Sequence, residues 1–299
     1  MTGEILGFLQ KNVVEYREHV SFRALSTVKI GGCVDVVAYP DNVEKLEALI
    51  CYVRNNKIRY KILGRASNVL PRDENFHGVV IKTDRMNSLM RDKNTLIVDA
   101  GISIPRLSRV AYSFGLSGLE ELSGIPGSLG GAIAGNAGAY GREIGQLVRS
   151  AALFDLDTGK FLELSKEEMQ FGYRDSILKH KDLIFVSAKL DLKNSNKDII
   201  RFAMRCFSEQ RRSSQPINQP SLGSVFKRPR EDLPSWRLID GAGMRGFRIG
   251  DAMVSEKHAG FIVNVGTATA GEYISLVQII QEKVYEKYGI KLEREFEII

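Results

Sequence analysis

Apolar residues recur at regular spacings along most of the chain. A period of three to four residues predicts helices, and short runs rich in Val, Ile, Leu and Phe predict strands. The predicted helices are 43–53 with Asp41 as its cap, 104–114, 198–211, 236–243 and 272–287. The predicted strands are 34–39, 60–63, 79–81, 96–100, 151–154, 161–164, 183–188 and 292–299. Helices and strands are therefore interleaved, and the pattern contains no repeat or coiled coil.

One long stretch, 124–141, breaks this pattern, since it holds seven of the 28 glycines and no charged residue. Glycine reaches positive φ and lets other groups approach the backbone, so dense glycines indicate N–H groups turned toward a ligand, most naturally an anion. Pro126 and Asn136 argue against a membrane span, because they would leave polar groups unsatisfied in lipid. A packing crossover without a ligand is the alternative, because glycine spacings often match by chance.

A second glycine turn, 64–68, follows the predicted strand 60–63 and reads Gly-Arg-Ala-Ser-Asn. Such a turn offers N–H groups, a hydroxyl and a guanidinium to a pyrophosphate. A surface turn explains the same residues equally well.

A polar stretch, 212–220, separates the last third of the chain from the rest. Its Ser, Gln, Asn and Pro residues are typical of a linker, so we expect a domain boundary there. With 299 residues the chain is long enough for two or three domains, and 43% hydrophobic with 26% charged residues is ordinary for a soluble globular protein.

The net charge is +6, but the basic residues are scattered apart from short clusters at 211–212 and 227–230. This charge suits an anionic small molecule as well as nucleic acid. Cys33, Cys51 and Cys206 form no C-x-x-C pair and the four histidines lack metal-ligand spacing, so we expect no disulfide framework, no metal site and a reducing cytoplasm. The N-terminus lacks the basic segment and apolar run of a secretory signal.

Familiar nucleotide and hydrolase motifs are absent. The glycines of 124–131 are spaced G-x-x-G-x-x-G-G, which is neither the dinucleotide-binding G-x-G-x-x-G nor a phosphate loop ending in Gly-Lys-Ser/Thr. The chain also has no G-x-S-x-G motif. A Rossmann fold, a P-loop fold and that class of hydrolase are therefore disfavoured.

The glycine motifs 124–131 and 136–141 resemble the flavin-binding signature of the UDP-N-acetylenolpyruvoylglucosamine reductase family, also called UDP-N-acetylmuramate dehydrogenase or MurB. Further matching motifs stand in the family's order at 27–32, 64–68, 173–174, 223–229 and Glu295. The resemblance implies an FAD-dependent oxidoreductase that reduces UDP-N-acetylglucosamine enolpyruvate to UDP-N-acetylmuramate with NADPH. That reaction is a step of bacterial peptidoglycan precursor synthesis, and so of cell-wall biogenesis, cell shape and cell division.

The same resemblance implies an α+β fold. Two α+β FAD-binding subdomains, of a flavoprotein type without a Rossmann fingerprint, are expected at 1–85 and 86–211. A C-terminal α+β substrate-binding domain is expected at 212–290, with the terminal strand 291–299 able to return to the second subdomain. We expect a cytoplasmic monomer that binds neither nucleic acid nor membrane.

Site residues follow from the resemblance position by position. The cofactor-binding set is Gly64, Arg65, Ala66, Ser67, Asn68, Gly124, Ile125, Pro126, Gly127, Ser128, Gly130, Gly131, Asn136, Ala137 and Gly138. The catalytic set is Arg174, which meets the enolpyruvyl carboxylate, Glu295, its acidic companion, and Ser224, the proton donor. The substrate-binding set is Tyr173, Arg212, Lys227 and His258. Of these, Arg212 and Lys227 would bind the diphosphate, and His258 lies in the last motif.

The chain departs from the family pattern in three places. Gly260 replaces an asparagine common in the last motif, and Ala134-Gly135 stands where a bulkier pair often precedes Asn136. The segment 175–182 is too short for the loop whose tyrosine clamps substrate in one subgroup. The chain therefore resembles the shorter subgroup.

Simpler roles exist for the catalytic residues when each is taken alone. Arg174 suits a surface salt bridge, Ser224 a turn cap and Glu295 an exposed strand carboxylate. A solvated basic face explains Lys227 and Arg212 about equally well. Two other function classes stay open: a different FAD oxidoreductase of the wider flavoprotein group, and a non-catalytic binder of sugar nucleotides or polyanions, which would be colourless.

Overall fold

The computed structural model describes residues 2–299 and separates into two compact units. Unit 1 consists of the chain up to Glu18, Val36–Arg65 and Gly78–Glu209. Unit 2 consists of His19–Asp35, Ala66–His77 and Gln210–Ile299. The chain therefore passes between the units several times, and each unit contains segments from distant parts of the sequence.

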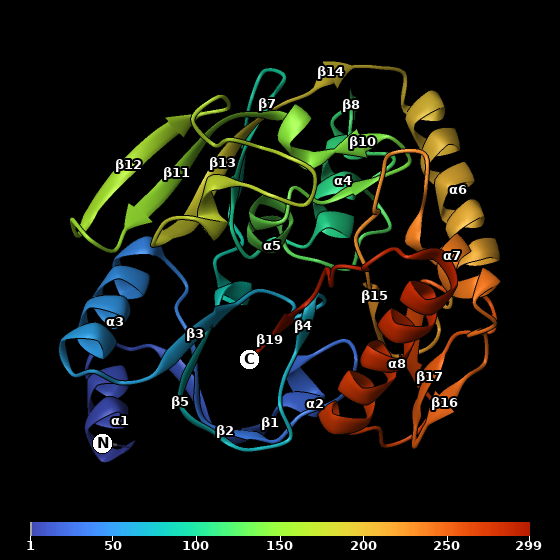
Figure 1. Cartoon of the computed structure of the whole chain (residues 1–299). Helices are drawn as coiled ribbons and strands as arrows, with labels where there is room; N and C mark the ends of the chain where they lie inside the picture. The colour runs from blue at the N-terminus through green and yellow to red at the C-terminus, as the bar shows by residue number, and fades with distance from the viewer. Residues whose placement is uncertain (1) are drawn as a thin grey trace. The chain divides into compact units, whose positions relative to one another are not determined.

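Helices and strands are mixed in both units, as Figure 1 shows. The helices of unit 1 are α1 (Thr2–Lys11), α3 (Val43–Asn55), α4 (Ile104–Ser113) and α5 (Leu129–Ala134), with 3-10 turns η1 (Thr83–Arg85), η2 (Ile144–Gln146) and η3 (Ile177–Lys179). Unit 2 holds α2 (Phe22–Leu25), α7 (Ser235–Gly241) and α8 (Ala270–Tyr288). Helix α6 (Lys197–Ser214) runs from one unit into the other.

The strands of unit 1 are β3 (Tyr60–Leu63), β6 (Leu89–Asp92), β7 (Thr95–Asp99), β8 (Leu116–Ser117), β9 (Gly138–Ala139), β10 (Arg142–Glu143), β11 (Val148–Asp155), β12 (Lys160–Ser165), β13 (Leu183–Asp191) and β14 (Lys193–Asn194). Unit 2 holds β4 (Val69–Leu70), β15 (Ser221–Ser224), β16 (Arg248–Ile249), β17 (Ala252–Val254), β18 (Phe261–Asn264) and β19 (Glu297–Ile298). The unit boundaries fall inside β1 (Glu15–Ser21), β2 (Cys33–Tyr39) and β5 (Phe76–Lys82).

Three larger sheets organise these strands. Unit 1 contains an antiparallel five-stranded sheet in the order β12-β11-β13-β7-β6. Unit 2 contains an antiparallel four-stranded sheet in the order β15-β18-β17-β16. A further four-stranded sheet has the order β1-β2-β5-β3, and in it β3 and β5 run parallel. The α+β fold class is therefore confirmed.

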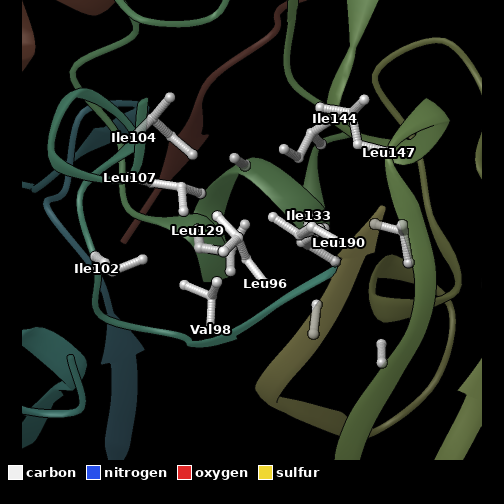
Figure 2. Packing of buried hydrophobic residues seen from close by; sticks show 14 of the residues in the cluster. Leu96, Val98, Ile102, Ile104, Leu107, Leu129, Ile133, Ile144, Leu147 and Leu190 are labelled. Atoms are coloured by element: carbon white, nitrogen blue, oxygen red, sulfur yellow. The ribbon is translucent and has the colours of Figure 1, made fainter. Parts of the chain in front are cut away.

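The glycine-rich stretch contributes a short helix to the core of unit 1. Leu129 and Ile133 of α5 are fully buried and lie among side chains of β7 and α4 in a cluster that Figure 2 shows. Its short residues allow this close packing, since a Cβ on Gly130 would lie 3.3 Å from the Ala100 carbonyl oxygen. The sequence did not predict this helix, because glycine lowers helix propensity and only two large apolar residues mark its face.

Two other apolar clusters complete the interior. In unit 1, α1 and α3 bury Leu9, Leu46 and Ile50 against Val79 and Ile81 of β5. In unit 2, α8 buries one face of the helix, including Leu276 and Ile280, against β17, β18 and α7. The apolar periodicity of 43–53 and 272–287 therefore predicted both helices and most of their buried faces, although Tyr288, expected on the buried face of α8, is exposed.

Local sequence signals explain most helix ends. Helix α8 begins with a capping box between Thr269 and Glu272 and ends at Gly289 with φ of +67°. The cap predicted for α3 was wrong: Asn42 accepts the Lys45 N–H at 2.8 Å, while Asp41 forms an ion pair with the Lys45 ammonium. Both residues are good caps, so position alone decided between them.

The end of the chain differs from its prediction. Only Glu297–Ile298 forms a strand in 292–299, and it pairs in parallel with Val69–Leu70 of unit 2 rather than with the 86–211 segment. The alternation of polar and apolar residues predicted an extended chain but carries no information about its partner. No helix in residues 2–299 is long and apolar enough to span a bilayer.

The Tyr273 hydroxyl lies in the unit 2 core and has no hydrogen-bond partner within residues 2–299. Tyr273→Phe is therefore expected to leave the free energy of unfolding unchanged or raise it by up to about 1 kcal/mol, because no bond is lost. Tyr273→Ala should lower it by about 3–5 kcal/mol, since it also removes the ring packed on Phe296. Urea unfolding followed by circular dichroism measures both, with the exposed Tyr285→Phe as control. A clear loss of stability in Tyr273→Phe would contradict this prediction.

Candidate functional site

The turn after β3 is held in place by two side chains of unit 1. A Cβ added to Gly64 would overlap the Ser128 hydroxyl, so only glycine fits there. The Lys82 ammonium donates a hydrogen bond to the Gly64 carbonyl. The structure thus brings the predicted cofactor residues Gly64 and Ser128 together, although 64 positions separate them in the sequence.

The backbone N–H groups of the glycine stretch have different tasks. Ser128 caps α5 and accepts the Gly131 N–H, while the N–H groups of Leu129 and Gly130 donate to the carbonyls of Ile102 and Ala100 at 2.8 and 2.9 Å. Within residues 2–299, no protein acceptor binds the N–H groups of Gly127 and Ser128, although both residues are buried. Buried N–H groups require an acceptor. These two are therefore the best candidates to hold an anion.

Asn136 joins three segments of unit 1. Its amide nitrogen donates to Glu143 and to the Gly172 carbonyl, each at 2.9 Å, and its amide oxygen accepts the Gly145 N–H at 3.0 Å. The residue is 1% exposed and has φ of +38°, a conformation that Asn tolerates better than most residues. Both amide N–H groups are used inside the protein, so this arrangement supports a positioning role for Asn136.

Arg174 lies in a tight turn that Asn136 fixes. Gly172 and Asp175 exchange backbone hydrogen bonds at 3.1 and 3.2 Å, which leaves Tyr173 and Arg174 at the tip. Arg174 has φ of +56°, which is unfavourable for a side chain of this size and typical of constrained functional positions. Its guanidinium lies 5.0 Å from the centre of the Tyr173 ring and donates to the Gly138 carbonyl.

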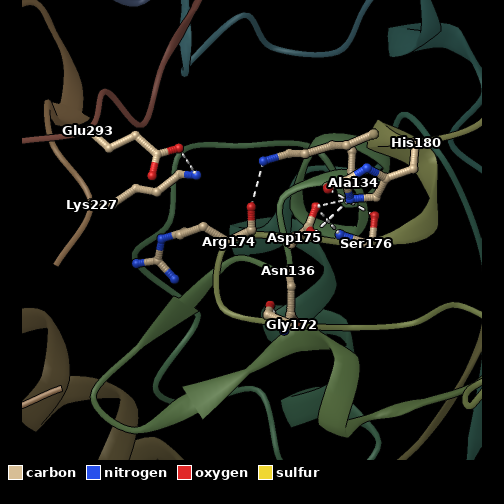
Figure 3. A network of polar contacts seen from close by, with 10 residues as sticks. Ala134, Asn136, Gly172, Arg174, Asp175, Ser176, His180, Lys227 and Glu293 are labelled. Atoms are coloured by element: carbon tan, nitrogen blue, oxygen red, sulfur yellow. Dashed lines mark hydrogen bonds and ion pairs between the residues drawn. The ribbon is translucent and has the colours of Figure 1, made fainter. Parts of the chain in front are cut away.

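The residues after Arg174 tie this turn to the glycine stretch, as Figure 3 shows. Ser176 is fully buried and its hydroxyl donates to the Ala134 carbonyl at 2.9 Å. The Asp175 carboxylate contacts His180 at 2.8 Å, and this hydrogen bond lowers the pKa of Asp175 below its usual range. The predicted residues Asn136, Gly138, Tyr173 and Arg174 therefore belong to one connected structure.

Unit 2 brings a second set of predicted residues together. Asn68 donates its amide to the Glu295 carbonyl at 3.1 Å and accepts the Glu297 N–H on its own carbonyl. The Glu295 N–H in turn donates to the Val225 carbonyl at 2.9 Å. The residue next to Val225 is Ser224, so the turn 66–68, the chain end and β15 meet through backbone contacts.

Ser224 ends β15 at an irregularity of the sheet. It pairs with Phe261 of β18, and the register shifts between Ser221 and Ser224. Gly223 causes this shift with φ of +81°, a conformation that favours glycine. Such bulges redirect side chains and occur near active sites.

The predicted phosphate ligands of unit 2 have protein contacts of their own. Lys227 is 26% exposed and its ammonium lies 2.5 Å from a carboxylate oxygen of Glu293 (Figure 3). Arg212 is exposed near the end of α6, where its carbonyl accepts a hydrogen bond from the Lys257 ammonium. Lys257 is therefore a basic neighbour of Arg212 that the sequence did not single out.

His258 packs within an aromatic group. Its ring lies 5.7 Å from Trp236 and 5.0 Å from Phe261, and its Nδ1 accepts the Gly260 N–H at 3.1 Å. Burial lowers the pKa of His258, which favours the neutral ring. A Cβ on Gly260 would lie 3.0 Å from the His258 ring, so this packing fits the glycine found where the family often has asparagine.

No group of three or more His, Cys, Asp or Glu residues within residues 2–299 is arranged to hold an ion.

Lys82 is the main polar residue of the candidate site that the sequence analysis did not name. The available signal was a lysine directly after the apolar run 79–81, at the end of a predicted strand.

Known proteins resemble this chain over nearly its whole length. Residues 34–165 match the FAD binding domain family, and residues 215–299 match the C-terminal domain of UDP-N-acetylenolpyruvoylglucosamine reductase. The reductase of that name from Thermotoga sp. strain RQ2 is 42% identical over 91% of this chain and 90% of its own length. The one from Syntrophomonas wolfei is 38% identical over 100% and 99%.

A solved structure of such a reductase also resembles this chain over nearly its whole length. The crystal structure of MurB from Thermus caldophilus has a TM-score of 0.80 at 34% identity and covers 95% of this chain and 98% of its own. Fold and site thus define an FAD-binding oxidoreductase. Within that class, the chain belongs to the UDP-N-acetylenolpyruvoylglucosamine reductase family, as the sequence motifs predicted.

Asn136→Ala is expected to lower the free energy of unfolding of the flavin-free protein by about 3 kcal/mol, because it removes all three hydrogen bonds of the buried amide and leaves the Gly145 N–H without its acceptor, while the Gly172 carbonyl keeps only the Asp175 N–H. Thermal unfolding of the flavin-free protein measures this loss. The exposed Asn194→Ala is the matched control and should change stability by less than about 0.5 kcal/mol. If Asn136 acted only through flavin, both variants would unfold like the parent.

Proposed function

We propose that this chain reduces UDP-N-acetylglucosamine enolpyruvate to UDP-N-acetylmuramate, with FAD as cofactor and NADPH as reductant. Its relatives are named for the reductase reaction, and the FAD binding domain match accounts for the cofactor. The observation that carries the proposal is the Arg174 turn, in which the Arg174 backbone has a constrained conformation and the neighbouring residues are bonded to the glycine stretch.

The residues of unit 1 fit the diphosphate of FAD. The N–H groups of Gly127 and Ser128 have no protein acceptor within residues 2–299, and Arg65 is exposed on the turn next to Gly64. Backbone donors fixed before binding hold an anion at a small entropy cost. In unit 2 the proposed cofactor residues are Ala66, Ser67 and Asn68. Bound FAD supplies the hydride-transfer chemistry that links NADPH to the enolpyruvyl group.

Arg174 is the proposed ligand of the enolpyruvyl carboxylate. When the terminal carbon of the double bond accepts a hydride, negative charge develops on the neighbouring carbon and on the carboxylate attached to it. A guanidinium that binds both carboxylate oxygens stabilises this charge more in the transition state than in the ground state. The turn around Arg174 keeps the group in place without reorganisation.

Ser224 is the proposed donor of the proton that completes the reduction. The carbon bearing the ether oxygen becomes strongly basic once the hydride has arrived, so a hydroxyl suffices as an acid. Glu295 is the proposed companion that orients or recharges this hydroxyl. This role is supported by the hydrogen bond from the Glu295 N–H to the carbonyl of Val225, the residue that follows Ser224.

The remaining roles concern substrate binding and the cell. Lys227 and Arg212 are assigned to the diphosphate of the substrate, and Tyr173 and His258 to its other parts. The protein acts as a cytoplasmic monomer in peptidoglycan precursor synthesis, and so in cell shape and division, without nucleic-acid or membrane partners. Three free cysteines agree with a reducing compartment.

The purified parent should show flavin absorbance, and Arg174→Lys should retain it. Lysine keeps the charge but lacks the planar fork, so the half-reaction with the enolpyruvyl substrate should slow at least about tenfold. The half-reaction with NADPH should remain largely intact. Stopped-flow absorbance measures both steps, with Arg149→Lys on the exposed surface as control. Equal slowing of both half-reactions, or a parent that neither carries nor binds FAD, would contradict the proposal.

Ser224→Ala should keep FAD and its reduction by NADPH but lose about a hundredfold in turnover, the usual effect of removing a positioned general acid. Ser224→Cys should lose less, because it retains a proton donor. Ser221→Ala at the other end of β15 is the control and should turn over like the parent. If Ser224 only caps the turn, Ser224→Ala should cost about 1 kcal/mol of stability and leave turnover unchanged.

A further inference from the structure

Unit 1 buries a lysine at the carboxyl end of β5. Lys82 is 3% exposed and stands opposite Leu63 in the parallel pair of β3 and β5. Both strands therefore end at the same edge, where Gly64 follows Leu63. Ligands of sheets with parallel strands commonly bind beyond the carboxyl ends of those strands.

The contacts of Lys82 leave its positive charge only partly balanced. Its ammonium donates to the Gly64 carbonyl and lies 3.3 Å from an oxygen of Asp84, a half-exposed carboxylate. No third acceptor contacts the ammonium within residues 2–299. Burial lowers the pKa of Lys82, Asp84 opposes this effect, and the positive charge of Arg65 lowers the pKa further. An anion that binds beside the Lys82 ammonium and the Arg65 guanidinium would offset the repulsion between these two positive charges.

The Gly64 carbonyl also sets the direction of the next backbone donor. A peptide group is planar and trans, so the Arg65 N–H points opposite to the carbonyl that Lys82 holds. The Ser128 hydroxyl occupies the space that a Cβ of Gly64 would fill. Lys82 therefore orients this peptide group through its carbonyl, and Ser128 packs directly against Gly64.

We infer that Lys82 is a positioning residue for the diphosphate of FAD. Its ammonium orients the Gly64–Arg65 peptide so that the Arg65 N–H is available to the ligand, and its buried charge adds to the attraction of the anion. This inference rests on the proposed function. It adds a residue from the end of β5, outside both glycine motifs.

The test compares FAD with riboflavin, which has the same ring system but no diphosphate. Lys82→Met removes the charge and the donor at similar length, and dissociation constants of the flavin-free full chain follow from quenching of flavin fluorescence. We expect FAD to bind at least about tenfold more weakly and riboflavin to change by less than about threefold. Lys160→Met, an exposed lysine of the same unit, should alter neither.

Asp84→Asn is expected to change the FAD affinity in the opposite direction to Lys82→Met. It removes the carboxylate that competes for the ammonium, so FAD should bind about threefold more tightly while riboflavin binding stays constant. Asp84→Asn therefore still tests the role of Lys82 if Lys82→Met does not fold. A purely structural ion pair predicts instead that each variant weakens both ligands to the same extent.

The outcomes separate this inference from the proposed function. A parent that binds no FAD contradicts the proposed function and this inference with it. A parent that binds FAD contradicts the role of Lys82 alone if Lys82→Met retains the parent's FAD affinity or weakens FAD and riboflavin in parallel. The role is likewise overturned if Asp84→Asn weakens FAD or leaves its affinity unchanged.

Discussion

The buried amide of Asn136 is the interaction on which the arrangement of unit 1 depends. It connects the end of the glycine stretch to the hairpin that follows it and to the turn that carries Arg174. An amide with both N–H groups satisfied inside the protein cannot leave without exposing unpaired backbone groups. Two neighbouring segments and a third, 36 positions further along the chain, are thus kept in one geometry, which is what a preorganised site requires.

The glycine stretch serves packing and binding at once. A Cβ on Gly138 would clash with the Arg142 carbonyl and one on Gly130 would be tightly packed, and the N–H groups of Leu129 and Gly130 donate to neighbouring carbonyls. The packing role of this stretch is therefore observed, and the anion site stays a prediction. Among the buried residues of this stretch, Gly127 and Ser128 keep N–H groups without a protein acceptor within residues 2–299, so the proposed binding part is shorter than the motif.

Local signals predicted most of the fold. The apolar periods of 43–53, 104–114 and 272–287 gave the observed helices and most of their buried residues, because amphipathic spacing is a property of the local sequence. Val110 is only half-buried and Tyr288 is exposed, although both were expected on buried faces. The short helix α5 was missed, since its six residues include two glycines. The end of the chain was misplaced, because an alternating pattern marks a strand but does not choose its partner.

The sequence by itself determined the class and the family, because its glycine, arginine and serine motifs have few other uses in combination, and it named the residues that are proposed to carry the chemistry. The tertiary structure decided which residues contact one another. Asn136 holds neighbouring segments through its three hydrogen bonds, and Lys82 became a candidate only through its contact with Gly64. Long-range contacts of this kind depend on how β3, β5 and α5 pack, and no local pattern encodes them.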